Sequence, residues 1–418
     1  MTITPPVVGS GSGRRAVAAP SEMRRRLGFV GMAWIYIVFQ TAAAAPSPIY
    51  VIYQKEWDVP AWQLGFAFSA YAFTLLLAIV TVGALSDHLG RRPVLAGALV
   101  VEVAAMAFLL FAANIETVLL ARLLQGFATG AAITTLSAAL TDLSPARNRQ
   151  LGAVFASVAP LIGLTVGALG TGIVIQIDPT GSATVFGILV ALLAVGAVFI
   201  ALSPTVVPRA PGALGSVVPR VRVPATARKA FRASTLLNVA VWLTSGLSLG
   251  LVGQINRDIF SIYAGLASGG TIALLMGIAS VTVFVFRTMD TRRSGVIASI
   301  ALAVGAGIIT VGILTGLFQV YLVGAAIAGF GTGLGFAGYI RLLVPTVGPE
   351  DRAGLFAAMY TVSYLTFGIP VIVAGILIAP FGASAVIVVY ACATLVVSAL
   401  AARSLIKYTP PVIEVAAR

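Results

Sequence analysis

The chain is poor in the side chains on which metal and redox chemistry depend. Its 418 residues include one cysteine, Cys392, and one histidine, His88. A single thiol cannot form a disulfide within the chain, and one thiol with one imidazole does not supply the ligands of a zinc or haem site. We therefore expect no metal and no cofactor.

Charged residues are also scarce. Only 9% of the residues are charged, 59% are hydrophobic, and the mean hydropathy is +1.04, whereas a soluble domain carries about 25% charged residues. Twelve apolar runs approach or exceed the ~20 residues needed to cross a bilayer. The sequence therefore predicts an all-α polytopic membrane protein with twelve transmembrane helices, near 27–45, 64–85, 93–112, 116–139, 151–175, 184–203, 234–253, 261–286, 295–316, 318–342, 354–378 and 384–402.

The net charge of +13 follows the topology of these spans. Of the 26 Lys and Arg, 23 fall in segments that belong to one side of the membrane; Lys55 and Arg257 lie in the other loops, and Arg122 lies within a span. Basic segments are retained in the cytoplasm, so we expect a multi-pass protein of the inner or plasma membrane with both termini cytoplasmic. The basic face can attract anionic membrane lipids. We expect no nucleic-acid partner, because no basic patch is interleaved with aromatic residues.

The chain repeats itself with a period near 200 residues. Gly126-Phe-Ala-Thr-Gly130 resembles Gly329-Phe-Gly-Thr-Gly333 at an offset of 203 residues, and Arg149 corresponds to Arg352 at the same offset. The repeat predicts two bundles of six helices, joined by a basic linker that cannot cross lipid. The predicted parts are a disordered cytoplasmic N-terminus (1–26), the first bundle (27–203), the linker (204–233), the second bundle (234–403) and a cytoplasmic tail (404–418).

A short charged turn separates the second and third predicted spans. It reads Gly-Ala-Leu-Ser-Asp-His-Leu-Gly-Arg-Arg-Pro from Gly83 to Pro93. This string resembles the signature loop of the major facilitator superfamily at Gly83, Leu85, Ser86, Asp87, Gly90, Arg91 and Arg92. It departs at His88, where the family usually has Arg or Lys. The resemblance implies that the two bundles rock about a binding site near the bilayer midplane, and that the protein works as a monomer.

The same resemblance suggests a conformational latch built from Gly83, Asp87, Gly90, Arg91, Arg92 and Asp142. In similar transporters the loop Asp sits near the N-terminal end of span eleven, here near Gly354, where the helix dipole favours a negative charge. The loop Arg pairs with an acid at the foot of span four, here Asp142. These contacts would hold the outward-open state closed on the cytoplasmic side. The alternative is a plain basic turn without this role.

Two charges are predicted inside the membrane, where each is costly. Glu102 lies nine residues past Pro93, so about 13 Å deep at ~1.5 Å per residue, and it could exchange a proton as the cavity switches sides. Arg122 belongs to Arg122-Leu-Leu-Gln-Gly126, which resembles the Arg-x-x-Gln-Gly motif of span four. That resemblance links the Arg to proton transfer, although an Arg itself keeps its proton. Alternatively, Glu102 only hydrogen-bonds a neighbouring span.

The resemblance also implies that spans one, four, seven and ten line the cavity. Polar and aromatic residues at a suitable depth are the candidate cavity residues: Trp34, Tyr36, Gln40, Gln125, Asn238, Trp242, Ser245, Tyr360 and Tyr364. We expect Pro46-Ser47-Pro48 to end span one with a helix break. Span five carries Gly163, Gly167, Gly170 and Gly172, which partly resembles an antiporter signature but lacks its Gly-Pro pair, and close helix packing is the simpler explanation.

These features favour a secondary active transporter that exports small amphipathic or drug-like molecules in exchange for protons. The alternative is a proton-coupled uptake carrier for a nutrient or metabolite. An enzyme is not expected, since neither a catalytic constellation nor a Gly-x-x-x-x-Gly-Lys-Ser/Thr nucleotide loop occurs in the chain.

Overall fold

The structure of the chain is a computed structural model that describes residues 21–145, 148, 150–204, 211–219 and 221–408. Helices make up nearly all of this part of the chain, and it contains no β-strand. Twelve helical segments within it are long and apolar enough to cross a membrane. The predicted all-α polytopic fold with twelve transmembrane helices is therefore confirmed.

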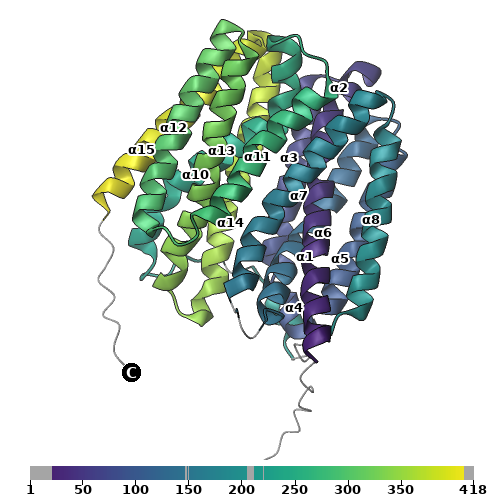
Figure 1. Cartoon of the computed structure of the whole chain (residues 1–418), viewed down its shortest axis with the longest axis vertical. Coiled ribbons are helices and arrows are strands. Elements are labelled where there is room, and N and C mark those ends of the chain that lie inside the picture. The colour runs from purple at the N-terminus through teal and green to yellow at the C-terminus, as the bar shows by residue number, and fades with distance from the viewer. Residues whose placement is uncertain (1–20, 146–147, 149, 205–210, 220, 409–418) are drawn as a thin grey trace, which may run out of the picture.

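Two bundles of helices lie side by side in Figure 1, the first coloured purple to teal and the second teal to yellow. The first bundle contains α1 (Glu22–Ala44), α2 (Pro46–Trp57), α3 (Ala61–Val82), α4 (Leu85–Leu89), α5 (Arg91–Leu110), α6 (Ile115–Asp142), α7 (Gln150–Ile177) and α8 (Ser182–Leu202). A short helix in the linker, α9 (Ala213–Ser216), precedes the second bundle. That bundle contains α10 (Arg228–Gln254), the π-helix η1 (Ile255–Ile259), α11 (Gly265–Val285), α12 (Thr291–Thr315), α13 (Phe318–Leu343), the short 3₁₀ turns η2 (Val344–Thr346) and η3 (Pro349–Asp351), α14 (Arg352–Phe381) and α15 (Ala383–Lys407).

The repeated glycines allow equivalent helices to approach closely in both bundles. Gly126 and Gly130 of α6 face the backbone of α3, and Gly329 and Gly333 of α13 face the backbone of α11. A Cβ atom at any of these four positions would lie within 2.5 Å of a carbonyl oxygen of the facing helix. Lipid offers no hydrophobic drive for helix association, so such close backbone contact is what holds the helices together.

The two bundles meet along two pairs of helices, α3 with α14 and α7 with α11. The period of 203 residues relates α3 to α11 and α7 to α14, so the two pairs are equivalent under the repeat. One polar contact crosses the first pair, because the Ser69 hydroxyl donates to the carbonyl oxygen of Gly368 at 2.9 Å. In the second pair, Gly172 packs against Gly265 and Gly269. The cavity described below lies between these two contacts.

Several predicted boundaries differ from those in the structure. Helix α1 begins at Glu22, inside the segment that was expected to be disordered, because the Ser21 side chain accepts a hydrogen bond from the Arg24 amide and caps the helix. The expected helix break is present, because α1 ends at Ala44 and α2 begins at Pro46, but the span does not end there. Ala45 is itself helical, so the segment runs from Glu22 to Trp57 with Pro46 at the start of α2, where its missing N–H costs little. Residues 1–20, Arg149 and the tail beyond Tyr408 lie outside the described residues.

One end of the molecule collects most of the basic residues, and we call it the basic end. It is the end where α1 begins, at the bottom of Figure 1, and where α15 ends, at the left edge of the picture. Arginines at this end donate to carbonyl groups at helix C-termini, where a cation is favoured. Arg92 Nη2 donates to the carbonyl of Ala201 in α8 at 2.6 Å, and in the other bundle Arg292 Nε donates to the carbonyl of Leu405 in α15 at 3.3 Å. Arg25 does the same for Leu143, just after α6, at 3.3 Å.

Candidate functional site

A central cavity of about 360 Å³ lies between the two bundles. Helices α1, α3, α6 and α7 line it from the first bundle, and α10, α11, α13 and α14 line it from the second. Near the basic end its wall includes Thr141 in the last turn of α6 and Phe356 in the second turn of α14. A second cavity of about 620 Å³ continues there and shares Ile133, Ser137, Phe356 and Tyr360 with the first.

The bundles close over this cavity at the end opposite the basic end. A Cβ on Gly253 would lie 2.3 Å from a methyl carbon of Val51, and one on Gly65 would lie 3.1 Å from the carbonyl oxygen of Val371. The aromatic side chains of Phe68 and Phe367 also meet there, with ring centroids 4.8 Å apart. The arrangement is therefore open toward the basic end and sealed at the other, which is one of the two states that alternating access requires.

Aromatic side chains make up much of the cavity wall. Trp242 of α10 is central, with its ring 4.8 Å from that of Tyr364 and 5.3 Å from that of Phe367. Tyr360 continues the row along α14 at 6.1 Å from Tyr364. Apolar and aromatic walls with a few polar groups are typical of sites for small organic ligands.

Arg122, Gln125 and Glu102 form a buried polar chain that runs away from the cavity. Arg122 Nη1 donates to Gln125 Oε1, and Gln125 Nε2 donates to Glu102 Oε1 at 3.3 Å and to the carbonyl oxygen of Ala42 at 2.8 Å. Thr129 donates to the other carboxylate oxygen of Glu102 at 3.4 Å. The amide of Gln125 therefore links the positive charge on α6 to the carboxyl group on α5.

The guanidinium group of Arg122 has an aromatic partner as well. Its central carbon lies 4.2 Å from the ring centroid of Tyr71 on α3, which is the geometry of a cation–π contact. Arg122 Nη1 also donates to the carbonyl oxygen of Ala43 at 3.3 Å. Its Nε is buried and has no hydrogen-bond partner among the described residues. Arg122 lines the cavity, whereas Glu102 is fully buried behind it and does not.

Six of the candidate cavity residues do line the central cavity: Tyr36, Gln40, Trp242, Ser245, Tyr360 and Tyr364. They come from α1, α10 and α14, so the structure brings together residues that are far apart in the sequence. Tyr36 is hydrogen-bonded to Ser137 of α6 at 3.3 Å. Within the part of the chain that the structure describes, the buried Oε1 of Gln40 and Nε1 of Trp242 have no hydrogen-bond partner.

The other three candidate cavity residues do not line the cavity in this structure. Trp34 is 37% exposed on the outside of the bundle, beside Phe199 of α8. Asn238 is buried between α10 and α14, where its amide nitrogen donates to the Ser363 hydroxyl at 2.9 Å. Gln125 belongs to the buried chain described above. All three lie in helices that line the cavity. The position of a residue along a span gives its depth in the membrane, but it does not give the side of the helix from which the side chain projects.

Sequence reasoning missed several aromatic cavity residues. Phe68 and Tyr71 of α3, Phe336 of α13, and Phe356 and Phe367 of α14 all line the cavity. Phe68 and Tyr71 were missed because span two was not expected to line it, and the others lie in helices from which different residues or none were chosen. A buried arginine needs a partner, and an aromatic ring is one that it commonly finds. The sequence offers many aromatic residues, and nothing in it distinguishes Tyr71 as the one that meets Arg122.

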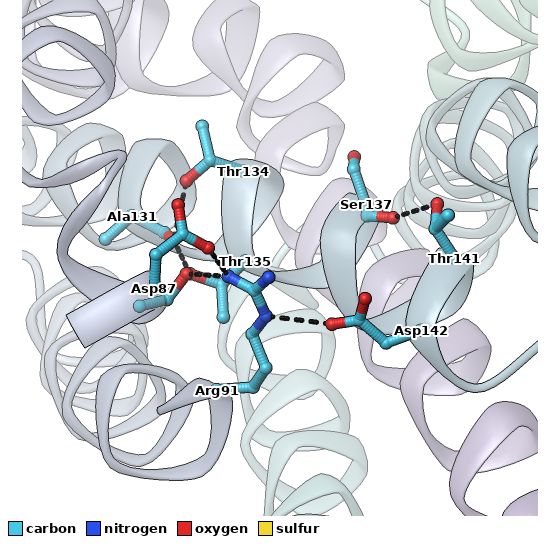
Figure 2. Close-up of polar contacts among 9 residues, drawn as sticks. Asp87, Arg91, Ala131, Thr134, Thr135, Ser137, Thr141 and Asp142 are labelled. Carbon is cyan, nitrogen blue, oxygen red and sulfur yellow. Dashed lines mark hydrogen bonds and ion pairs between the residues drawn. The ribbon is translucent and has the colours of Figure 1, made fainter. Parts of the chain in front are cut away.

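The predicted latch residues gather at the basic end. Arg91 lies between two carboxylates, as Figure 2 shows, with Nη1 at 2.5 Å from Asp87 Oδ1 and Nε at 3.2 Å from Asp142 Oδ2. Gly90 has φ +89°, a conformation that an L-residue rarely adopts, and it turns the chain from α4 into α5. Arg91 also donates to the Ser86 hydroxyl at 2.7 Å.

Asp87 does not reach the start of α14 in this state. It lines the second cavity together with Gly83 from the same loop and Ala353 from the first turn of α14. Arg92 is turned away from the loop toward α8, as described above. The cavity therefore occupies the space that a contact between Asp87 and α14 would fill.

Linker residues form part of the wall of this second cavity, which the sequence did not indicate. Gly212, Gly215, Ser216 and Val218 contribute to its wall. His88 Nδ1 is hydrogen-bonded to the carbonyl oxygen of Pro211 at 2.9 Å, and the amide of Arg222 donates to the carbonyl of Gly354 in α14 at 3.2 Å. The linker is thus attached to both bundles across the basic end.

The family model described as the Major Facilitator Superfamily matches residues 32–289, which is more than half of the chain. The chain therefore belongs to the major facilitator superfamily. The curated relatives described below carry the names of transporters.

Curated relatives match only part of the chain. An uncharacterized transporter of Rickettsia bellii (strain RML369-C) is 34% identical over 105 residues, 25% of each chain. The inner membrane transport protein YajR of Escherichia coli (strain K12) is 32% identical over 96 residues, 23% of this chain and 21% of that one. A D-xylose transporter of Levilactobacillus brevis is 28% identical over 96 residues, 23% of this chain and 21% of that one. The match spans at most about a quarter of each relative.

Two solved structures share the fold over most of their length. A POT family transporter in complex with 5-aminolevulinic acid has a TM-score of 0.72 at 13% identity, covering 90% of this chain and 95% of the other. The human organic anion transporter MFSD10 (TETRAN) has a TM-score of 0.65 at 17% identity, covering 93% of this chain and 100% of the other. At these identities the likeness concerns the fold alone.

Proposed function

We propose that the protein exports small amphipathic or drug-like molecules in exchange for protons, by alternating access of the central cavity to the two sides of a membrane. It would act as a monomer in the inner or plasma membrane, with the basic end and both termini in the cytoplasm. The positive-inside distribution of Lys and Arg supports this orientation. In it, the cavity described above faces the cytoplasm, where an exporter collects its substrate.

One observation carries the proposal. The aromatic cavity touches Arg122, and Arg122 is linked through Gln125 to Glu102, a buried acid that substrate cannot contact. A carboxyl group in this position can take up and release a proton without leaving the protein. Its charge acts on Arg122 over a short path through a region of low dielectric, where electrostatic interactions are strong. A proton on Glu102 and a ligand beside Arg122 therefore influence each other.

A second candidate is a proton-coupled uptake carrier for a nutrient or metabolite. It is favoured by the fixed positive charge in the cavity. A negatively charged substrate beside Arg122 replaces the ionised Glu102 carboxylate as the counter-charge of the arginine. Glu102 would then bind a proton more readily, so the substrate and the proton would each favour the binding of the other. A carrier with this linkage moves both in the same direction, whereas exchange requires that they bind in competition.

Transport assays on the full chain in proteoliposomes test the proposal. Labelled amphipathic compounds are added with a pH gradient of either direction, with and without a protonophore, and in vesicles of each orientation. Export in exchange for protons predicts accumulation against the direction of proton flow, abolished by the protonophore. Accumulation along the direction of proton flow would favour the uptake carrier. A transport rate that does not depend on the pH gradient would contradict proton coupling in both candidates.

A further inference from the structure

The charges in the central cavity have one sign. Arg122 is the only charged side chain among the described residues that line it. Its possible counter-charge, Glu102, lies outside the cavity and reaches Arg122 only through the amide of Gln125. An Arg keeps its proton in a protein, so the cavity presents a permanent positive charge to whatever enters.

Donor groups in the cavity are also unused. Both hydrogen bonds that Arg122 makes to described residues come from Nη1, and its buried Nε–H has no partner. The buried Nε1–H of Trp242, on the opposite bundle, has no partner either. A buried donor without an acceptor is destabilising, and more so when it is charged. Both side chains line the cavity, although these two atoms are closed off from it in this state, so a substrate that shifts them can supply the missing acceptor.

We propose that the central cavity binds an organic anion with an aromatic body, and that Arg122 binds its acidic group while Trp242 donates a further hydrogen bond. The aromatic walls suit a flat ring, and the unpartnered Gln40 Oε1 suits a substrate that also carries a hydroxyl or amide N–H near the acid. A cationic amphiphile fits this cavity poorly. It would meet the charge of Arg122 with no acid on the wall to compensate.

A purely structural role for Arg122 does not account for these observations. Its bond to Gln125 uses Nη1 alone, and its stacking on Tyr71 uses the face of the guanidinium group. The edge that carries Nε stays free, and this edge is one that binds a carboxylate in a bidentate pair. The inference rests on the proposed function in taking the central cavity as the substrate site. If Glu102 is the coupling acid, an anion beside Arg122 favours the binding of a proton, so the inference supports the uptake carrier over export in exchange for protons.

Binding of three probes with the same ring tests the inference. They are 2-naphthoate, which is anionic, 2-naphthamide, which is neutral, and protonated 2-naphthylmethylamine. Binding to the full chain is measured at pH 7 in phosphatidylcholine nanodiscs, which present no anionic lipid as a competitor. A charge-assisted hydrogen bond contributes about 1.5–3 kcal/mol, so we expect 2-naphthoate to bind at least about tenfold tighter than either other probe. Equal affinities, or tighter binding of the amine, would overturn the inference.

Two variants and a matched control locate the anion site. Trp242→Phe keeps the ring and removes one N–H donor, and we expect about fivefold weaker binding of 2-naphthoate, the scale of one hydrogen bond. Trp34→Phe makes the same change on the outside of the bundle and should change nothing. Arg122→Gln should abolish the preference for the anion, and Arg122→Lys, which keeps the charge, should retain part of it. A folded Arg122→Gln protein that keeps the full preference would rule out Arg122 as the anion ligand.

The experiment remains decisive if the Arg122 variants do not accumulate, since the probe series on the unchanged protein and the Trp242→Phe comparison need neither of them. Failure of this inference is also separable from failure of the proposed function. Anion binding without proton-driven transport counts against the proposed function alone. Proton-driven transport without anion preference counts against the inference alone.

Discussion

Gln125 lies between Arg122 and Glu102, and it is bonded to both. Its amide oxygen accepts from the guanidinium group, and its amide nitrogen lies 3.3 Å from the carboxylate of Glu102. The two charges thus influence each other through one neutral side chain. This permits the carboxyl group to change its protonation while the arginine stays in place at the cavity wall.

Replacing Glu102 by Gln tests whether this acid carries the transported proton. The amide has nearly the same shape and can keep hydrogen bonds to Gln125 and Thr129, so we expect the protein to fold. Transport driven by a pH gradient should fall by at least about tenfold, since proton-coupling groups in membrane spans are costly and functional. Exchange of labelled for unlabelled substrate, which needs no proton, should continue.

Glu116→Gln is the control for this substitution, because Glu116 is an exposed acid at the start of α6. It should leave proton-driven transport unchanged. If the Glu102→Gln protein still accumulates substrate in response to a pH gradient as the unchanged protein does, Glu102 is not the coupling group.

Replacing Asp142 should affect mainly the stability of the protein, whereas replacing Asp87 should affect mainly the balance between its conformational states. Asp142 pairs with a partly exposed Arg91, and such pairs contribute about 0–1 kcal/mol. Asp142→Asn should therefore lower the free energy of unfolding by no more than about 1 kcal/mol. Asp87→Asn should leave stability nearly unchanged but depopulate the state open at the other end, because that state needs a carboxylate near the N-terminus of α14.

Distances between spin labels on α5 and α12 at the basic end report this change. The population with long distances should rise in Asp87→Asn. Glu22→Gln is the control, since Glu22 is an exposed acid at the same end that pairs only with Arg26. An unaltered distance distribution in Asp87→Asn would exclude the latch role of this residue.

His88 attaches the linker to the first bundle, so His88→Ala should loosen the linker. One hydrogen bond contributes about 0.5–1.5 kcal/mol, which corresponds to about 2- to 10-fold faster hydrogen exchange of the amides in residues 211–219. Mass spectrometry of deuterated peptides measures this rate. Lys407→Ala, at an exposed position in the last turn of α15, should have no effect on it. Equal exchange in the His88→Ala protein would mean that the bond does not hold the linker.

Gly126 and Gly170 offer a matched pair of substitutions to alanine. A Cβ on Gly126 would lie 2.2 Å from the carbonyl oxygen of Tyr71, whereas a Cβ on Gly170 would meet no atom within 4 Å. Overpacking costs about 1–3 kcal/mol or more, so Gly126→Ala should lower the thermal unfolding temperature clearly. Gly170→Ala should be neutral or stabilising, because alanine favours the helix. Thermal unfolding followed by circular dichroism in detergent compares them, and equal unfolding temperatures would show that α6 and α3 can separate at no cost.

The sequence alone determined the number of spans and the family. Apolar runs of sufficient length have one low-energy form in lipid, the helix, since every backbone group must be satisfied within the segment. The loop from Gly83 to Pro93 and the repeated glycines around Gly126 and Gly329 are also visible as short sequence patterns. The first is typical of a tight turn, and the second is typical of helices that approach each other closely. Such features can be recognised without any knowledge of what lies opposite them.

Only the tertiary structure decided which side chains share the cavity. Trp34 and Tyr36 are two residues apart in α1, yet Trp34 faces outward and Tyr36 lines the cavity. In a helix that is apolar on all sides, the sequence carries little information on which side faces the partner bundle. The link from Arg122 through Gln125 to Glu102 depends in the same way on how α6 is rotated against α5. Composition places a helix in the membrane, but packing against its neighbours sets its rotation, and that rotation selects the residues that meet the substrate.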